Sequence, residues 1–177
     1  MRRFLPWLAV AVLLVPILAA FAWREGGGSA ARMVDDEGRR VLVVDGDTLK
    51  VGARTVRLAG IDALERAQFC MDAKGTSWSC GQAALASLHA SVARGGFHCR
   101  AVEEDRYGRT ISRCVSGGAD VGAMLVADGL AVSTGDYDWQ ESVAREARRG
   151  AWAGTFETPA IWRERNHVMP RTVARPH

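Results

Sequence analysis

Charged residues gather in a short segment that otherwise alternates between apolar and polar residues, as a β-strand does. The segment reads VVDGDTLKVGARTVRLAGIDALE and covers residues 43–65. Its carboxylates have no histidine nearby, so they offer only oxygen ligands, which suit a hard cation such as Ca²⁺ or Mg²⁺. An arginine among them can hydrogen-bond two phosphoryl oxygens and neutralise charge that grows in a transition state. These residue types indicate phosphodiester hydrolysis.

Each charged residue of the segment also has a simpler structural explanation. Asp45 and Asp47 flank a glycine, which is typical of a turn, and Asp62 ends a predicted strand. Arg57 is harder to explain in this way. If its two apolar neighbours face the core, its guanidinium lies on the other face of the sheet and needs an anionic partner. Arg109, in a later DRYGR turn, adds a second candidate for a phosphate contact.

The elements that must position these residues follow from periodicity and turn residues. Apolar alternation predicts strands over residues 40–44, 48–51, 55–61, 96–102 and 109–115. Helical spacing and capping residues predict helices over 80–96, 120–129 and 138–154. We therefore expect five short strands and three helices.

Four cysteines suit an exported protein, because disulfides persist in oxidising compartments. Cys99 and Cys114 lie equally far from the middle of a predicted hairpin, so they should face each other. Cys70 and Cys80 would then close a short loop. A four-cysteine zinc site is the alternative, but the spacings lack CxxC pairs.

The chain divides into four parts by composition. Residues 1–23 join two arginines to an apolar run over 4–23, which predicts either a cleaved signal peptide or an uncleaved membrane anchor. Both place the remainder outside the cytoplasm, periplasmic or secreted. Residues 24–39 form a Gly-rich, charged linker, 40–163 the folded domain and 164–177 a basic tail. The net charge of +3 permits a polyanionic partner without requiring one.

Four linked pieces, VVDGDT, VRLAGIDALE, DRYGR and ARRGAWAG, run in this order through the folded part. Together they make the chain resemble the thermonuclease, or staphylococcal-nuclease-like, family over residues 40–162. The resemblance implies an α+β fold, a five-stranded OB-like β-barrel with three helices, in agreement with the predicted elements. It also implies a nuclease that hydrolyses DNA or RNA with the help of Ca²⁺.

The resemblance further assigns roles to individual residues. Asp47, Asp62 and the main-chain oxygen of Ala63 would hold the Ca²⁺ ion. Glu65 would act as general base, and Arg57 and Arg109 would bind the scissile phosphate and stabilise the transition state. The residues expected to contact the nucleotide are Arg106, Tyr107 and Tyr137.

Leu64 departs from the family pattern, because relatives usually have a proline before the general base. Proline fixes φ, so its replacement predicts a Glu65 that is held less firmly. The alternative function is a nucleic-acid-binding module of the same fold with impaired catalysis. We expect a monomer whose partner is nucleic acid, with the membrane as a second contact through residues 4–23.

Overall fold

The computed structural model describes residue 33 and residues 35–167. The predicted signal or anchor, all but the end of the linker, and the tail beyond residue 167 lie outside the described residues. Within the described part, no helix is long and apolar enough to span a membrane.

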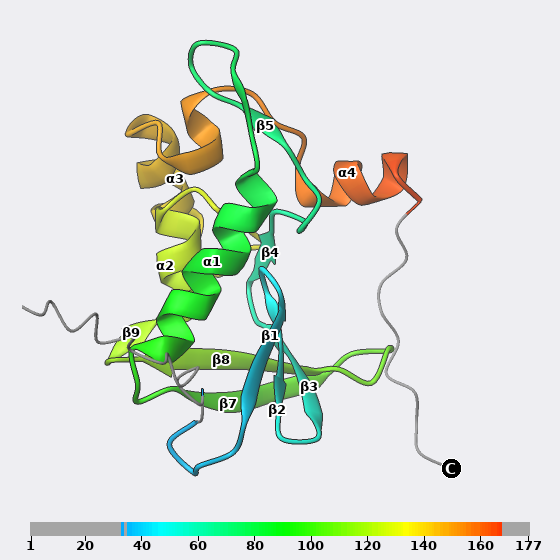
Figure 1. Cartoon of the computed structure of the whole chain (residues 1–177), viewed down its shortest axis with the longest axis vertical. Helices are drawn as coiled ribbons and strands as arrows, with labels where there is room; N and C mark the ends of the chain where they lie inside the picture. Colours follow the sequence, from blue (N-terminus) through cyan, green and yellow to red (C-terminus); the bar gives the residue numbers. More distant parts are fainter. Residues whose placement is uncertain (1–32, 34, 168–177) are drawn as a thin grey trace, which may run out of the picture.

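A mixed sheet forms the base of the domain (Figure 1). Its strands follow the order β1-β2-β3-β8-β7, and β9 pairs with β8. All neighbours are antiparallel except β3 and β8, which are parallel. The bounds are β1 Val41–Asp45, β2 Thr48–Val51, β3 Arg54–Leu58, β7 His98–Glu104, β8 Thr110–Ser116 and β9 Ala119–Asp120.

The strand predicted over residues 55–61 is wrong in its extent, because the chain breaks it after β3. Gly60 has a φ of 75° and turns the backbone, so that β4 (Ile61–Ala63) leaves the main sheet. β4 pairs with β10 (Ala131–Ser133) instead. The turn separates Asp62 from Arg57 along the chain but lets the two side chains meet.

Four α-helices and a 3₁₀-helix complete the described part. The bounds are α1 Cys80–Ala93, α2 Val121–Ala127, α3 Asp138–Glu146, the 3₁₀-helix Gly150–Ala153 and α4 Pro159–Arg165. α2 begins as predicted, because the Asp120 carboxylate accepts a hydrogen bond from the Ala123 N–H at 2.9 Å. The helix predicted over 138–154 is shorter than expected, since Arg148 takes a φ of 51° after α3.

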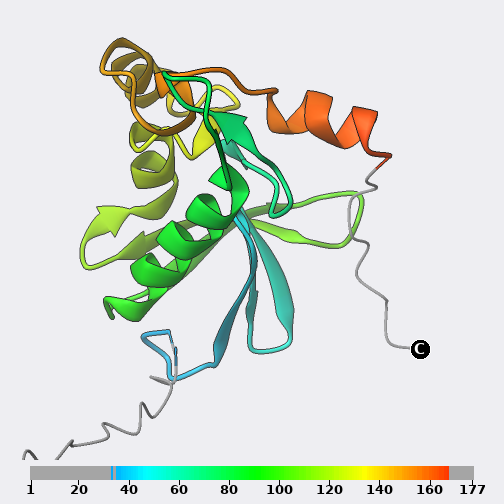
Figure 2. The ribbon, with the colours of Figure 1, turned by 45° about the horizontal axis from the view of Figure 1, so that its top comes forward.

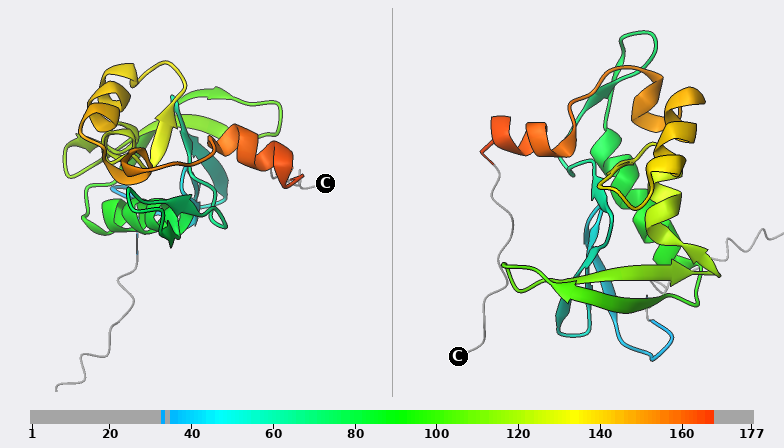
Figure 3. Two further views of the ribbon diagram at one scale, coloured as in Figure 1. Left: turned by 90° about the horizontal axis from the view of Figure 1, so that it is seen from above. Right: turned by 180° about the vertical axis from the view of Figure 1, so that it is seen from behind.

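The fourth α-helix was not predicted. Thr158 precedes α4, and Pro159 occupies its first turn, where a proline costs no backbone hydrogen bond. Figures 1 and 3 show α4 apart from the other helices and close to β4, which it contacts. The OB-like expectation is consistent with this domain, but the predicted count of three helices is too low.

The core lies between the sheet and the first two helices. α1 contacts β1, α2 contacts β8, and the two helices contact each other (Figure 2). Leu49, Leu88, Phe97 and Leu125 are fully buried there. Burial of a side chain of this size stabilises the fold by roughly 1.5–3 kcal/mol. These apolar residues fix the sheet on which the charged segment lies.

Both predicted disulfides are present. Cys99 and Cys114 are directly opposite each other in the β7–β8 ladder. Cys70 and Cys80 connect the small hairpin of β5 (Cys70–Met71) and β6 (Ser77–Trp78) to the first residue of α1. The described residues contain no free cysteine. The zinc alternative is therefore excluded for these four residues.

Candidate active site

Asp47 reaches the site through a tight turn between β1 and β2. A Cβ on Gly46 would lie 2.9 Å from the Cβ of Ala63 and 3.1 Å from that of Ala84, so only glycine lets this turn approach β4 and α1. The Asp47 carboxylate is 5% exposed and accepts a hydrogen bond from the Thr48 hydroxyl at 2.8 Å. Burial raises the pKa of Asp47, although the charge of Arg57 opposes the shift.

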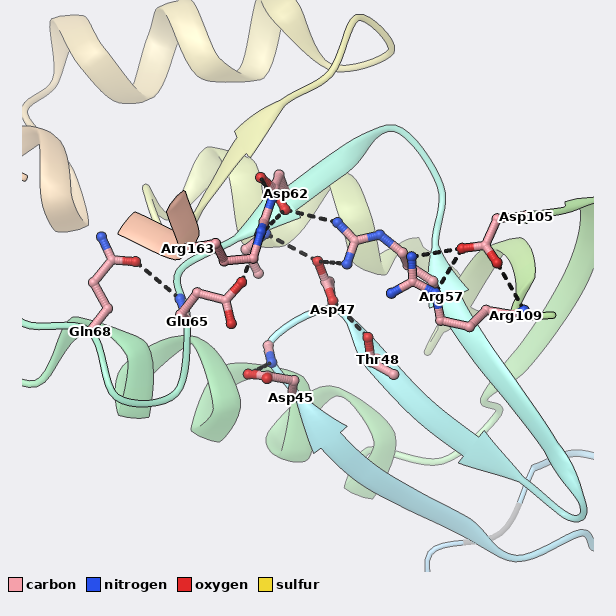
Figure 4. Close-up of polar contacts among 12 residues, drawn as sticks. Asp45, Asp47, Thr48, Arg57, Asp62, Glu65, Gln68, Asp105, Arg109 and Arg163 are labelled. Atoms are coloured by element: carbon pink, nitrogen blue, oxygen red, sulfur yellow. Dashed lines mark hydrogen bonds and ion pairs between the residues drawn. The ribbon is translucent and has the colours of Figure 1, made fainter. Parts of the chain in front are cut away.

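Arg57 bridges two carboxylates from β3 (Figure 4). Its Nη1 lies 2.7 Å from Asp47 Oδ2, and its Nη2 lies 2.8 Å from Asp62 Oδ1. Burial would lower the pKa of this guanidinium, but the two carboxylates outweigh burial and raise it. The partner that the sequence required for Arg57 is therefore a pair of aspartates, one from the β1–β2 turn and one from β4.

The main-chain oxygen of Ala63 lies on the edge of β4 that faces Asp47. The Leu64 N–H donates to the Leu130 oxygen at 3.1 Å, and antiparallel pairs alternate between bonded and non-bonded residues. Ala63 is thus a non-bonded position, and its N–H donates to Asp47 Oδ2 at 3.3 Å. The structure therefore brings Asp47, Asp62 and Ala63 together.

Glu65 follows β4 and is fixed through its backbone. Its N–H donates to Gln68 Oε1 at 3.1 Å, and the Gln68 side chain donates in turn to the Glu157 carbonyl at 2.7 Å. The Glu65 carbonyl lies against Gly81 at the start of α1, so closely that a Cβ on Gly81 would collide with it. Burial raises the pKa of Glu65, and Arg163 only partly opposes this shift.

Leu64 has a structural reason to replace proline. It is 1% exposed in the core, and its N–H donates to the carbonyl of Leu130, just before β10. A proline has no N–H and would lose that hydrogen bond. Gln68 and Gly81 contact the backbone of Glu65. That Leu64 leaves Glu65 less firmly held stays a prediction.

Arg109 lies in the β7–β8 turn, beside the strand that carries Arg57. β3 and β8 are paired so that Arg57 faces Ile111, two residues beyond Arg109 and on the same face of the sheet. The Arg109 guanidinium donates to Asp105 Oδ2 from Nε at 2.7 Å. Arg109 therefore borders the cluster without pairing with its carboxylates (Figure 4).

The two residues before Gly108 extend the basic edge of this turn. Arg106 is exposed and its guanidinium carbon lies 5.0 Å from the centre of the Tyr107 ring. Arg109 lies 5.5 Å from the same ring. Tyr107 is thus a partly exposed aromatic ring between two cations, as a nucleotide contact would require.

Tyr137 does not lie at this edge. It is 5% exposed, and its hydroxyl contacts both carboxylate oxygens of Asp120 at 3.0 Å and accepts from Arg113 at 3.2 Å. Burial and the Asp120 carboxylate raise the pKa of Tyr137 to about 12. The prediction that this ring stacks on a base does not fit its placement, because a buried ring offers no face to a nucleotide.

Arg163 is the charged residue that the sequence analysis missed. From α4, its Nη1 and Nη2 donate to Asp62 at 2.9 and 2.8 Å, and Nη1 also donates to Glu65 Oε1 at 2.6 Å. These hydrogen bonds, those to Asp62 most of all, raise the pKa of Arg163. Pro159 after Thr158 was the available signal, because it marks a helix start that would have placed Arg163 within the fold.

The oxygen donors fit a hard cation by type. Arg57 contacts Asp47 and Asp62, and the Ala63 N–H donates to Asp47. Carboxylate and carbonyl oxygens are the ligands of Ca²⁺. As arranged here, no group of three or more acidic, histidine or cysteine side chains among the described residues is ready to hold a metal ion. Both oxygens of Asp62 accept hydrogen bonds from arginines.

Comparison with known proteins agrees with the fold. A family model described as staphylococcal nuclease homologue matches residues 55–154. A protein of Rhizobium meliloti (strain 1021), named succinoglycan biosynthesis protein ExoI, is 30% identical over 143 residues, which span 77% of this chain and 73% of that protein. Proteins of Escherichia coli O157:H7 and Escherichia coli, each named uncharacterized endonuclease, are 28% identical over 177 aligned residues, covering 93% of this chain and 99% of theirs. The matched range contains Arg57, Asp62, Glu65 and Arg109.

Proposed function

Because the chain belongs to the staphylococcal nuclease homologue family, we propose that it is a calcium-dependent nuclease that hydrolyses phosphodiester bonds of DNA or RNA. One observation carries this proposal: Asp47, Arg57 and Asp62, from three separate elements, form a continuous set of contacts that continues to Glu65. The endonuclease name of the Escherichia coli relatives supports the same activity.

In this proposal Asp47, Asp62 and the Ala63 carbonyl hold the calcium ion. When bound, the ion would supply positive charge that polarises the phosphoryl group. Arg57 lies beside it, and its planar guanidinium can donate two hydrogen bonds to phosphoryl oxygens. Arg109 would donate to the phosphate from the neighbouring strand, so that charge growing in the transition state meets two fixed cations.

Glu65 is the general base in this proposal. Its N–H donates to Gln68, its carbonyl lies against Gly81, and its carboxylate accepts a hydrogen bond from Arg163. A carboxylate held in this way can accept a proton from a water molecule aligned with the phosphorus. Tyr107 and Arg106 would contact the nucleotide beside the scissile bond.

The impaired-module alternative has lost its main support. It rested on Leu64, whose N–H and side chain both have structural roles in this fold. All the charged residues that the family resemblance requires are present. We therefore retain the nuclease as the proposed function.

Export is the proposed location. The apolar run over residues 4–23 favours secretion or anchoring, and two disulfides are consistent with an oxidising compartment. Fractionation of cells that produce the full chain, followed by detection of the protein in periplasm, membrane and medium, tests this location. Recovery in the cytoplasm alone, with reduced cysteines, would contradict it.

The direct test of the function is hydrolysis of single-stranded DNA and RNA with Ca²⁺ and with excess chelator. Arg57→Lys keeps the charge but loses the two-pronged geometry, so we expect its rate to fall about 10²–10³-fold. Arg54→Lys, exposed on the same strand, is the matched control and should retain the parent rate. Hydrolysis that persists in chelator, or an Arg57→Lys variant within a few-fold of the parent, contradicts the proposal.

A further inference from the structure

Arg163 makes three hydrogen bonds with the acidic cluster, and Arg57 pairs with two of its oxygens. Its guanidinium covers both oxygens of Asp62 and one oxygen of Glu65. Its side chain is only 25% exposed, although it projects from a short helix near the end of the described residues. The family match ends at residue 154, before this helix begins.

The positive charge of the Arg163 guanidinium balances carboxylates that a metal cation could otherwise balance. Asp47, Asp62 and Glu65 are close together and largely buried, and burial of like charges is costly unless opposite charges balance them. Arg57 compensates Asp47 and one oxygen of Asp62. Arg163 compensates both oxygens of Asp62 and one oxygen of Glu65, so the two guanidinium groups offset most of the negative charge of the three carboxylates.

α4 is anchored at its start by Pro159, which is fully buried, whereas residues 160–165 are partly or largely exposed. It contacts β4, and the Gln68 side chain donates to the Glu157 carbonyl just before the helix. Arg165, on the same helix, pairs with Glu157 and not with the cluster. The bonds from Arg163 to Asp62 and Glu65 therefore link the part of α4 after Pro159 to the site.

We propose that Arg163 is a latch that competes with the divalent cation for Asp62. The inference rests on the proposed function, because it requires the cation site at Asp47, Asp62 and Ala63. Without cation, Arg163 neutralises Asp62 and holds α4 against β4. When the cation is bound, it neutralises Asp62 in place of the guanidinium. Arg163 then leaves the Asp62 oxygens, and α4 is held less tightly.

The test is calorimetric titration of Ca²⁺ into the metal-free protein. Arg163→Gln removes the competing charge, so the dissociation constant for Ca²⁺ should fall on the order of tenfold, as for coupled sites in general. Arg163→Lys keeps a charge that covers fewer oxygens and should give an intermediate value. Arg165→Gln, the matched control, should bind like the parent because its partner lies outside the cluster.

A second measurement uses the parent protein alone. Hydrogen exchange of the backbone amides in residues 160–165 should become faster when Ca²⁺ is added, because the latch has opened. This readout also decides the matter if Arg163→Gln does not fold by circular dichroism. Unchanged or slower exchange on Ca²⁺ binding overturns the latch.

The remaining outcomes separate the latch from the nuclease. If the parent binds Ca²⁺ and cleaves DNA while Arg163→Gln binds Ca²⁺ within twofold of the parent or more weakly, the latch is wrong and the nuclease stands. If neither parent nor variants bind Ca²⁺, the proposed cation site is wrong and the latch falls with it.

Discussion

Two turns of this protein have the same local structure but different surroundings. DDEGR, residues 35–39, precedes β1, and DRYGR, residues 105–109, joins β7 to β8. In each, the first aspartate accepts the backbone N–H groups of the third and fifth residues and the Nε of the arginine. In each, the glycine N–H donates to the aspartate carbonyl at 3.0 Å. Aspartate, glycine and arginine at this spacing therefore encode a turn.

The two turns differ in their place in the sheet and at their second and third residues. The function proposed for the second turn depends on these two differences. Arg109 lies next to Arg57, whereas Arg39 is 40% exposed and pairs with Glu37 as well as Asp35. The first turn is acidic and would repel a polyanion. The second carries Arg106 and Tyr107, which would attract one. The DRYGR pattern alone is thus weak support for a phosphate site.

The largest expected difference between the turns is in catalysis. Arg109→Ala should lower the rate of DNA hydrolysis about 10²–10³-fold, because a donor to the transition state is lost. Arg39→Ala removes the equivalent turn contact and should leave the rate within about threefold of the parent. Initial rates at saturating Ca²⁺ decide between them. Equal losses in both variants would show that Arg109 acts only through the stability of its turn.

A smaller difference is expected in substrate affinity. Tyr107→Ala removes the ring between two arginines and should weaken nucleotide binding about 5- to 100-fold, because stacking contributes roughly 1–3 kcal/mol per base. Glu37→Ala, at the equivalent position of the first turn, should not weaken binding. The measurement is equilibrium titration with a nucleotide bisphosphate. A Tyr107→Ala variant with parental affinity would remove this residue from the substrate site.

The glycines should behave alike in the two turns. Gly38 and Gly108 have φ values of 77° and 75°, so an alanine at either position costs about 1–2 kcal/mol of stability. Urea unfolding of Gly38→Ala and Gly108→Ala measures the cost. Only Gly108→Ala should also reduce hydrolysis, because it displaces Arg109. A large loss of stability in one variant and none in the other would contradict the conclusion that the two turns have the same local structure.

The smallest expected effect is the shared dependence on pH. Burial alone would raise the pKa of Asp35 and of Asp105, but hydrogen bonds from the turn arginine outweigh it, and each net pKa lies below its ordinary value of 3.8. Each carboxylate therefore stabilises the fold above its unfolded pKa, and this contribution is lost as the pH falls through the lower folded pKa.

Asp35→Asn and Asp105→Asn test this sign. Each variant should lose stability near pH 7, and its difference from the parent should shrink as the pH falls below 3.8 and the parental carboxyl takes up a proton. Urea midpoints over a series of pH values measure the difference. A gap between variant and parent that widens in acid would contradict the assigned direction.

The sequence was informative where function and local structure depend on neighbouring residues. Alternation placed Arg57 opposite the core, and symmetry about a hairpin paired Cys99 with Cys114. Both conclusions needed only strand periodicity and one turn. The same local information could not separate the DRYGR turn from its acidic counterpart, since their hydrogen bonds are the same.

Contacts between distant segments could not be predicted in this way. Tyr137 looked like a free aromatic residue because its partners, Asp120 and Arg113, lie on other elements. Arg163 lies 101 positions from Asp62 in the sequence, and nothing local to α4 indicates an acidic partner. Such pairs depend on how the elements pack, which periodicity does not describe.

The most direct test of the proposed active site is the single-turnover rate of Glu65→Gln on single-stranded DNA at saturating Ca²⁺. We expect the rate to fall about 10²–10⁴-fold, because glutamine cannot accept the proton, while the fold and nucleotide affinity stay near those of the parent. Glu103→Gln, exposed on β7, is the control and should keep the parental rate. A folded Glu65→Gln variant that binds nucleotide and cleaves within a few-fold of the parent would contradict the site at Asp47, Arg57, Asp62 and Glu65.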